Sequence, residues 1–487
     1  PDIFRVIHKQ GEFHPDEIKG DAGKVKVRGV FLYRILYISE GEDRTPEVLE
    51  GSIPVDEIVF LNDLEEGDLV DFHWDLEDLH ASAIHSRKTN LKCVLALTVE
   101  AMKEQPVPLV GSSQEEEDLY VRTCPVRLQQ EVIHKKDTLR IREEMNLPPG
   151  RPNIRRILWR EMRLQGTEIR QEEGRLLAKG ELMVFFLYEC EDEPGRLQWL
   201  EQGIPFHQEV ECEACHSDLT GKAELTLQRS ELELQADYDG EPRMVRIDAV
   251  CDLLLRYFEE QTSDVLCDAY SLTREVIPKK QQYEWDFVKN LSDSRARVSG
   301  RVKLKDTDPK VMQILNTGAQ IHLEHTERND QGVLIQGTVE LWVLYASSDD
   351  AQPLACTTHS IPFEHTAEQQ EEADRLEWQI FLCLDQLLVT MLDAQELEVK
   401  AVLQIQVLFC GTEKLELVED LEEAPLNMER IRRMPGMVIH IVQPGETLWE
   451  ISKAHATTCE AVMELNELKE EELKSGQKVL MVKEIAR

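Results

Sequence analysis

Basic residues are scarce in this chain. Its 487 residues include 55 Lys and Arg against 94 Asp and Glu, which gives a formal net charge of −39. Nucleic-acid phosphates and anionic lipids both require a basic counter-surface. The composition therefore predicts no nucleic-acid binding, and it excludes docking on anionic lipid through charge alone. A basic protein partner and mere solubility both remain compatible with the charge.

Long apolar runs are also missing. The longest are typified by 183–188 and 93–99, far short of the roughly 20 residues that cross a bilayer. We therefore predict no membrane insertion. No signal peptide is recognisable, but the chain begins at Pro1 rather than Met, so we expect its native N-terminus to be missing.

The cysteines do not resemble a disulfide framework. There are 11, an odd number scattered along the chain, which predicts a reducing, cytosolic compartment. Cys212 and Cys215, with His216 and His207 nearby, have the one spacing typical of a metal site. No second Cys/His pair follows in register, so we predict ordinary loop cysteines and no metal.

Catalytic motifs are absent as well. The sequence has no phosphate-binding loop, dinucleotide-binding glycine pattern, nucleophile elbow or zinc-protease helix. We therefore predict no catalytic residues, no cofactor and no enzymatic activity.

What the chain does contain is an internal repeat. Three stretches share a proline, a glycine 28 residues later, the tyrosine of a Leu-Tyr pair eight residues after that, and the proline of an Ile-Pro pair a further 17 residues on. These anchors are Pro1, Gly29, Tyr37 and Pro54; Pro152, Gly180, Tyr188 and Pro205; and Pro309, Gly337, Tyr345 and Pro362. The constant spacing predicts three copies of one domain.

The chemistry of each copy favours β-structure. The segment from the glycine to the tyrosine is dense in β-branched and aromatic residues, and many short strands separated by turns indicate a sandwich or barrel. The glycine predicts a bulge or a close backbone approach, and the Ile-Pro proline a strand edge or start. Copies two and three are preceded by Glu-Val-Ile-His-Lys-Lys from Glu131 and Glu-Val-Ile-Pro-Lys-Lys from Glu275. Copy one lacks this signature, so we expect it to lack a strand and to expose an edge or pair with another chain.

The end of the chain has a different pattern. Residues 414–436 are rich in Glu, Pro and Arg and are predicted to be a partly helical linker. The rest indicates a strand, two helices and a strand, with capping boxes at Thr447 with Glu450 and at Thr457 with Glu460. Trp449 is predicted to anchor the core of this segment.

Both patterns resemble known families. The repeat, over about residues 1–413, resembles the SPOCS domain of spore-coat assembly proteins, a family with structural and interaction roles. The run Val-Gln-Pro-Gly-Glu-Thr-Leu-Trp from Val442, then Asn466 and the segment 473–480, resembles a LysM module. Glu446 stands where that family usually has aspartate, and Met481-Val482 where Ile-Pro is common, which puts the ligand contacts of the first loop in doubt. LysM modules bind N-acetylglucosamine polymers in a shallow groove. The resemblance implies a groove lined here by Gly445, Glu446, Thr447, Leu448, Asn466 and Leu468.

The order of the domains indicates a more specific family. Three SPOCS copies (1–127, 128–270 and 271–413), a linker (414–436) and a LysM module (437–487) resemble SipL-like spore-coat morphogenetic proteins, with SpoVID a more distant parallel. The resemblance implies an adaptor in the mother-cell cytoplasm at the surface of the developing spore. Its LysM module would dock onto a SpoIVA-like coat basement protein, and its SPOCS copies would contact further coat proteins. A glycan-binding protein is the alternative, and an enzyme with LysM as a targeting tag is a third class.

Overall fold

The computed structural model describes residues 2–41, 44–102, 118–193, 195–349, 352–369 and 376–484. The chain forms two compact units. The first, called here the repeat unit, comprises Pro1–Glu104, Glu131–Glu259 and Val288–Cys410. The second, the C-terminal unit, comprises Gln105–Gln130, Glu260–Phe287 and Gly411–Arg487. Four long strands contribute residues to both units: β6 (Leu119–Asn146), β11 (Met244–Ser271), β12 (Arg274–Lys303) and β17 (Glu396–Pro425).

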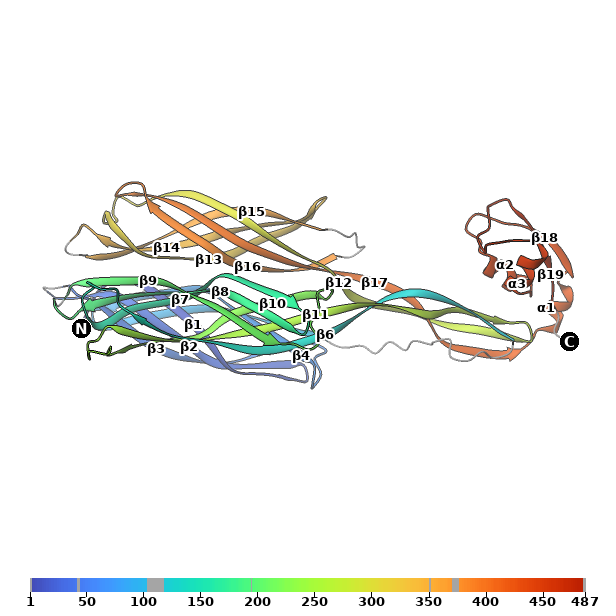
Figure 1. Ribbon diagram of the computed structural model, residues 1–487, viewed down its shortest axis with the longest axis horizontal. Coiled ribbons are helices and arrows are strands. Elements are labelled where there is room, and N and C mark those ends of the chain that lie inside the picture. Colours follow the sequence, from blue (N-terminus) through green and yellow to red (C-terminus); the bar gives the residue numbers. More distant parts are fainter. Residues whose placement is uncertain are drawn as a thin grey trace. The chain divides into compact units, whose positions relative to one another are not determined.

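Each copy of the repeat begins with a three-stranded antiparallel sheet in which the strand carrying the Leu-Tyr pair is central. The strands are β1 (Ile3–Asp21), β2 (Lys24–Ser39) and β3 (Pro46–Phe60); β7 (Ile154–Glu172), β8 (Arg175–Cys190) and β9 (Leu197–Glu211); and β13 (Val311–Asn329), β14 (Gly332–Ser347) and β15 (Leu354–Glu368). Figure 1 shows these strands in the three copies.

A second sheet completes each copy. Its strands are β4 (Leu69–His85) and β5 (Lys88–Met102) in copy one, β10 (Thr220–Gln235), β11 and β6 in copy two, and β12, β17 and β16 (Leu376–Met391) in copy three. A separate buried cluster of apolar side chains lies in each copy. The predicted mainly-β class with sandwich-like copies is confirmed.

The second sheet of copy one has two strands where the other copies have three. The additional strands are β6 and β12, and they contain the signatures at Glu131 and Glu275. Among the described residues, no third strand pairs with β4 and β5, and the expectation that copy one lacks an N-terminal strand stays a prediction. Pairing of its edge with another chain stays a prediction.

The tyrosine anchor is tied to the first proline of its own copy. The hydroxyl of Tyr188 donates to the carbonyl oxygen of Pro152 at 3.3 Å, and that of Tyr345 to Pro309 at 3.0 Å. Both tyrosines are buried, and this bond explains why proline and tyrosine keep a constant separation.

The other two anchors also have equivalent places in the three copies. Pro54, Pro205 and Pro362 each lie in an edge strand, as predicted, opposite Val30, Glu181 and Thr338 of the central strand. A Cβ at Gly29 would lie 2.4 Å from the carbonyl oxygen of His14, and one at Gly337 would lie 2.3 Å from that of His322. The neighbouring strand shifts its register beside both glycines. The expected close approach and bulge are confirmed.

The three copies share one centre. Leu36, Leu187 and Leu344, the leucines of the three Leu-Tyr pairs, meet in one buried cluster together with Trp159 and Phe185. Successive residues of a strand point to opposite faces. Tyr188 and Tyr345 therefore enter the cores of their own copies, and the leucine before each tyrosine enters the cluster that joins the copies.

Two expectations about segment boundaries need correction. Residues 414–436 are not mainly a linker, because β17 continues through Pro425, whereas the expected helical part is present as α1 (Met428–Arg433). The boundaries expected at residues 127 and 413 fall inside β6 and β17. β17 has 30 residues, and polar residues alternate with apolar ones in its last part, so no continuous apolar run marks its end in the sequence.

The expectation that the cysteines form no disulfides is wrong for four of the eleven, whereas the other seven are free. Cys124 pairs with Cys267, and Cys212 pairs with Cys215. The second bridge closes the turn after β9, where the carbonyl oxygen of Cys212 accepts the backbone N–H of Cys215 at 2.8 Å. Among the described residues, no group of three His, Cys, Asp or Glu side chains could hold a metal ion.

Replacing Tyr188 or Tyr345 by phenylalanine tests the tyrosine anchor. Each change removes one hydroxyl that donates to a backbone carbonyl and keeps the buried ring. We expect each to lower the free energy of unfolding by about 1 kcal/mol, measured as a shift of the urea midpoint. Tyr238→Phe is the control, because Tyr238 is fully exposed in a turn. Equal stability of all three variants would contradict the role of the bond.

Candidate functional site

The C-terminal module consists of β18 (Met437–Ile441), α2 (Leu448–Ala454), α3 (Cys459–Leu465) and β19 (Lys478–Val482) (Figure 1). This is the predicted order of strand, helix, helix and strand. The two strands pair antiparallel, with Met437 opposite Val482 and Ile441 opposite Lys478. The module has its own buried core of Val442, Leu448, Ile451, Val462, Val479 and Met481.

The first loop is shaped by its own side chains. Gly445 has a φ of +87°, which a residue with a side chain rarely adopts. The carboxylate of Glu446 accepts the backbone N–H of Gln443 at 2.7 Å and a hydrogen bond from Nε2 of His440 at 2.8 Å. These bonds, the first above all, hold the pKa of Glu446 below its usual value. Glu446 therefore stabilises the loop in the position where the family usually has aspartate.

Of the two predicted helix caps, one is confirmed and the other is displaced by one residue. Thr447 and Glu450 form the predicted capping box of α2. At α3 the prediction was one residue off, because Thr458, not Thr457, caps the helix by accepting the backbone N–H of Ala461 at 3.0 Å. Two adjacent threonines offer the same hydroxyl, so the sequence pattern could not distinguish them.

The other predicted groove residues have structural contacts. Leu448 belongs to the module core. The side-chain amide of Asn466 donates to the carbonyl oxygens of Val462 and Leu480, and its oxygen accepts the N–H of Leu480 at 2.7 Å. Leu468 is half-buried, and its N–H donates to the carbonyl oxygen of Met463 at 2.9 Å.

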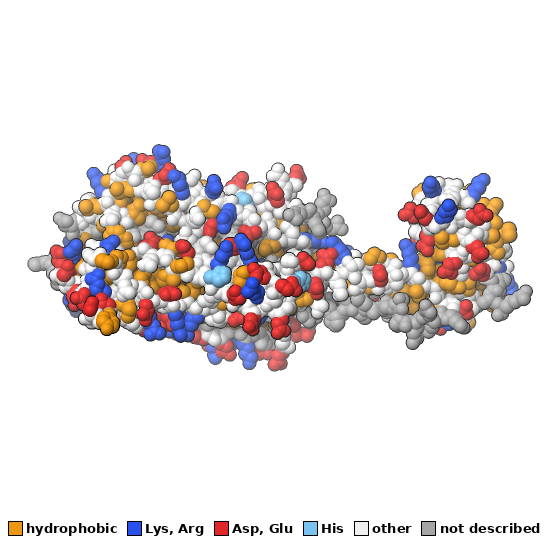
Figure 2. Space-filling model, viewed as in Figure 1, with side chains coloured by type: hydrophobic (Ala, Val, Ile, Leu, Met, Phe, Trp, Pro, Cys, Tyr) orange, Lys and Arg blue, Asp and Glu red, His pale blue; other side chains and the backbone are white. Residues whose placement is uncertain are grey.

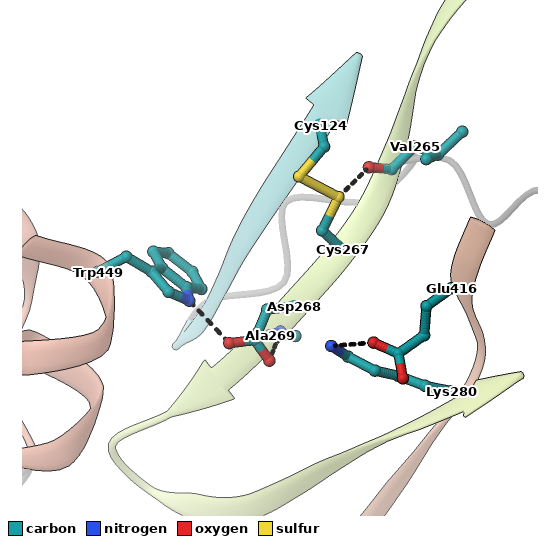
Figure 3. The surroundings of a disulfide bond; sticks show 8 residues. All are labelled: Cys124, Val265, Cys267, Asp268, Ala269, Lys280, Glu416 and Trp449. Atoms are coloured by element: carbon teal, nitrogen blue, oxygen red, sulfur yellow. Dashed lines mark hydrogen bonds and ion pairs between the residues drawn. A yellow bond between two sulfur atoms is a disulfide. The ribbon is translucent and has the colours of Figure 1, made fainter. Parts of the chain in front are cut away.

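Trp449 is not a core anchor of the module, contrary to the sequence prediction. It is half-buried, and its indole Nε1 donates to the carboxylate of Asp268 on β11 at 2.8 Å (Figure 3). Its ring lies edge-on to Tyr270, with the ring centroids 4.8 Å apart. Trp449 therefore joins the module to β11 within the C-terminal unit.

Two further contacts strengthen this junction. Nζ of Lys453 donates to Asp268 at 2.6 Å and to the carbonyl oxygen of Ala269 at 3.2 Å. The hydroxyl of Tyr270 donates to the carbonyl oxygen of Thr457 at 3.0 Å. Sequence reasoning missed Asp268 and Tyr270, because no local pattern links them to a module about 180 residues away in the chain.

A disulfide stands beside this junction. Cys124 of β6 and Cys267 of β11 form it one residue before Asp268 (Figure 3). Near it, Tyr120 of β6 stacks on Tyr270, with the ring centroids 5.2 Å apart. The bridge fixes the two strands that present the contacts of the module.

A cavity of about 690 Å³ lies between the module and these strands. Of the six predicted groove residues, it is lined by Glu446, Thr447 and Leu448, but not by Gly445, Asn466 or Leu468. Its further lining is Leu119, Tyr120, Val121, Arg122, Thr123, Tyr270, Trp449, Cys459, Glu460, Glu471, Glu472 and Leu473. The volume suits a small ligand or a few side chains of a partner. Four of these residues are glutamates and one is an arginine, so the cavity is unsuited to an anionic ligand. The binding role of the six residues stays a prediction.

Asp268→Asn tests the junction. Burial alone would raise the pKa of Asp268, but hydrogen bonds from Lys453 and Trp449 lower it below its usual value. A lowered pKa means that the charge contributes stability above pH about 3.8, and that this contribution disappears as the pH falls through the lower, folded-state pKa. At neutral pH, we expect the substitution to weaken the interaction between the module and β11 by about 1 kcal/mol. This weakening should be seen as faster amide hydrogen exchange in α2.

The control for this variant is Asp264→Asn, an exposed position on the same strand. In the wild type and in Asp264→Asn, α2 should lose protection from amide exchange as the pH falls through the pKa of Asp268. In Asp268→Asn, this pH-dependent loss should be absent. Equal exchange rates in both variants at neutral pH would contradict the junction.

Two known protein families match parts of the chain. The family model described as "SipL, SPOCS domain" matches residues 2–84, 153–235 and 310–380, one stretch in each copy of the repeat. The LysM domain model matches residues 440–481, which contain the first loop, both module helices and most of the module sheet. Neither a curated protein nor a solved structure matches the chain. Within the described ranges, no helix has the length and apolar character needed to cross a membrane.

Proposed function

We propose that this chain, a sporulation-related protein with the SipL-like architecture of three SPOCS domains and one C-terminal LysM domain, is a non-enzymatic structural adaptor of spore-coat assembly. The observation that carries the proposal is the combination of three copies with one terminal LysM module. The copies pack around a shared centre, and the module has a separate core in the other unit. Such an arrangement supplies a rigid body with one distinct recognition element.

The proposal assigns recognition to the LysM module. The module docks onto a SpoIVA-like coat basement protein, and the SPOCS copies present surfaces to further coat proteins. The adaptor acts in the mother-cell cytoplasm at the surface of the developing spore. The module suits this role, because it has its own core and a capped helix, and because Trp449, Lys453 and Thr457 attach it to β11 within the C-terminal unit.

A binding assay with a purified SpoIVA-like protein tests this assignment. The full chain is compared with a fragment that ends at residue 426, after β17 and before α1. Ending the fragment at Glu413 would cut β17 and leave part of β12 without its partner strand. We expect the fragment to keep the β-sheet circular dichroism of the chain and to lose binding. Full binding by the fragment would move recognition to the SPOCS copies.

Glycan binding is the second candidate, because LysM modules bind N-acetylglucosamine polymers and the LysM model matches this module. Its cavity has aromatic residues, Tyr120, Tyr270 and Trp449, of a kind that stacks on sugar rings. Four glutamates in the lining disfavour anionic wall polymers. Co-sedimentation of the full chain with insoluble chitin and with peptidoglycan tests this function. Co-sedimentation without binding to the SpoIVA-like protein would make glycan binding the function of the module.

The proposal also holds that the chain catalyses no reaction. Its support is the absence of catalytic motifs from the sequence. Incubation with ATP, with and without the SpoIVA-like protein, tests one activity directly. Turnover by the purified chain alone would contradict the proposal.

A further inference from the structure

The two-stranded sheet of the C-terminal module has one covered face and one open face. On the covered face, Val479 and Met481 are buried in the module core. On the open face, Met437 and Ile439 are each 63% exposed and Ile441 is 50% exposed. Their cross-strand neighbours Leu480 and Val482 lie on the same face. We call these five residues the outer sheet face.

An apolar outer face is unusual for such a sheet. An antiparallel sheet with one packed face normally presents polar side chains to solvent on the other. Here three successive outward positions of β18 are large and apolar, and contiguous apolar surface of this kind marks an interaction site. Hydrophobic side chains gather on the edge of this module that carries β18 and β19 (Figure 2). The face lies apart from the cavity, because none of the five residues lines it.

Basic residues stand at both ends of the outer sheet face. Lys478 pairs with Ile441 at one end. At the other end, Lys483 follows β19 and binds helix α1, donating from Nζ to the carbonyl oxygen of Ile431 at 2.8 Å and from its backbone N–H to Gly436 at 3.1 Å. This places α1 next to the Met437 end of the sheet. Helix α1 carries three exposed arginines, Arg430, Arg432 and Arg433, against one glutamate.

We propose that the outer sheet face is the docking surface of the module for an acidic protein segment that presents apolar side chains. The inference rests on the proposed function, and it names the face and the charge of the partner. Charge complementarity identifies the occupant: a chain with a net charge of −39 places a local group of cations beside an exposed apolar strand. The face offers no aromatic ring to a sugar, so a polysaccharide does not fit it.

Substitution of Ile439 by aspartate in the full chain tests the apolar part of the proposal. The probe is the purified SpoIVA-like protein. Ile439 is highly exposed, so we expect melting to be nearly unchanged, while an unpaired carboxylate buried in the interface weakens binding about tenfold or more. Leu465→Asp is the matched control, because Leu465 is an apolar residue of the same module, 44% exposed, outside the outer sheet face. It should bind as the wild type does.

Substitution of Arg432 by glutamate tests the charge of the partner. We expect binding about threefold or more weaker at low salt, with the difference shrinking as salt is raised, and rescue by Arg432→Lys. Unchanged binding by Arg432→Glu would overturn the acidic character of the occupant.

The remaining outcomes separate this inference from the proposed function. If the fragment ending at residue 426 loses binding but Ile439→Asp and Leu465→Asp bind equally, the outer sheet face is wrong and the module still carries recognition. If the wild-type chain does not bind the SpoIVA-like protein, both proposals fail. If the wild-type chain is a dimer that Ile439→Asp dissociates in light-scattering measurements, the occupant is a second copy and the inference is overturned.

Discussion

Replacing Leu448 by alanine is expected to unfold the C-terminal module. Leu448 is 1% exposed and packs in a core of only six buried residues. Truncating a buried leucine typically costs about 2–5 kcal/mol, and a module of about 50 residues has little stability to lose. In an isolated module covering residues 426–487, we expect the cooperative melting transition to disappear. In the full chain, binding to the SpoIVA-like protein should be lost.

The adjacent residue provides the control. Trp449→Ala removes a larger side chain, but this side chain contacts Asp268 and Tyr270 outside the module rather than the module core. The isolated Trp449→Ala module should therefore melt nearly as the wild-type module does. In the full chain, the same substitution should speed amide exchange in α2. Loss of melting in the isolated Trp449→Ala module would show that the indole anchors the core after all.

Replacing Leu187 by alanine is expected to destabilise all three copies of the repeat at once. Leu187 is fully buried where the three copies meet, in one apolar cluster with residues of copies one and three. We expect a loss of about 2–5 kcal/mol, because neighbours from three copies cannot all move to fill the cavity. Chemical denaturation of the full chain measures this effect as a shift of the main transition.

The matched control for Leu187→Ala is Leu323→Ala. Leu323 lies on the corresponding first sheet of copy three but is largely exposed, so its truncation should cost little. A Leu187→Ala variant in which only residues of copy two lose protection in hydrogen exchange would show that the shared centre does not couple the copies.

The repeat could be predicted from the sequence because each anchor residue makes a specific contact within its own copy. A tyrosine that binds a proline carbonyl, and a glycine beneath a close backbone oxygen, each need a fixed number of residues between them. The helices of the module were predictable for the same reason, since a capping box spans only three residues. Leu448 and Ile451 then fall on the buried side of one short helix.

The junction of the module could not be predicted. The partners of Trp449 lie on β11, and a tryptophan among helical apolar residues has the same pattern whether its neighbours are local or remote. The disulfide between Cys124 and Cys267 was missed because spacing along the chain says little about a pair separated by 143 residues. The pair Cys212 and Cys215 was noticed, but two cysteines three residues apart have the same spacing whether they are free or bridged. The shared centre was missed as well, because the alternation of Leu and Tyr shows that both faces are apolar but not what covers each one.

The meeting of Leu36, Leu187 and Leu344 has a consequence for how such a chain can change over generations. A string of independent domains can gain or lose a member by unequal recombination, since each neighbour keeps its own core. Here the removal of one copy would open the joint cluster to water, because the cluster draws residues from all three copies. The cluster therefore opposes the loss of a copy, and we expect variation among related chains in loops and outer faces rather than at these positions.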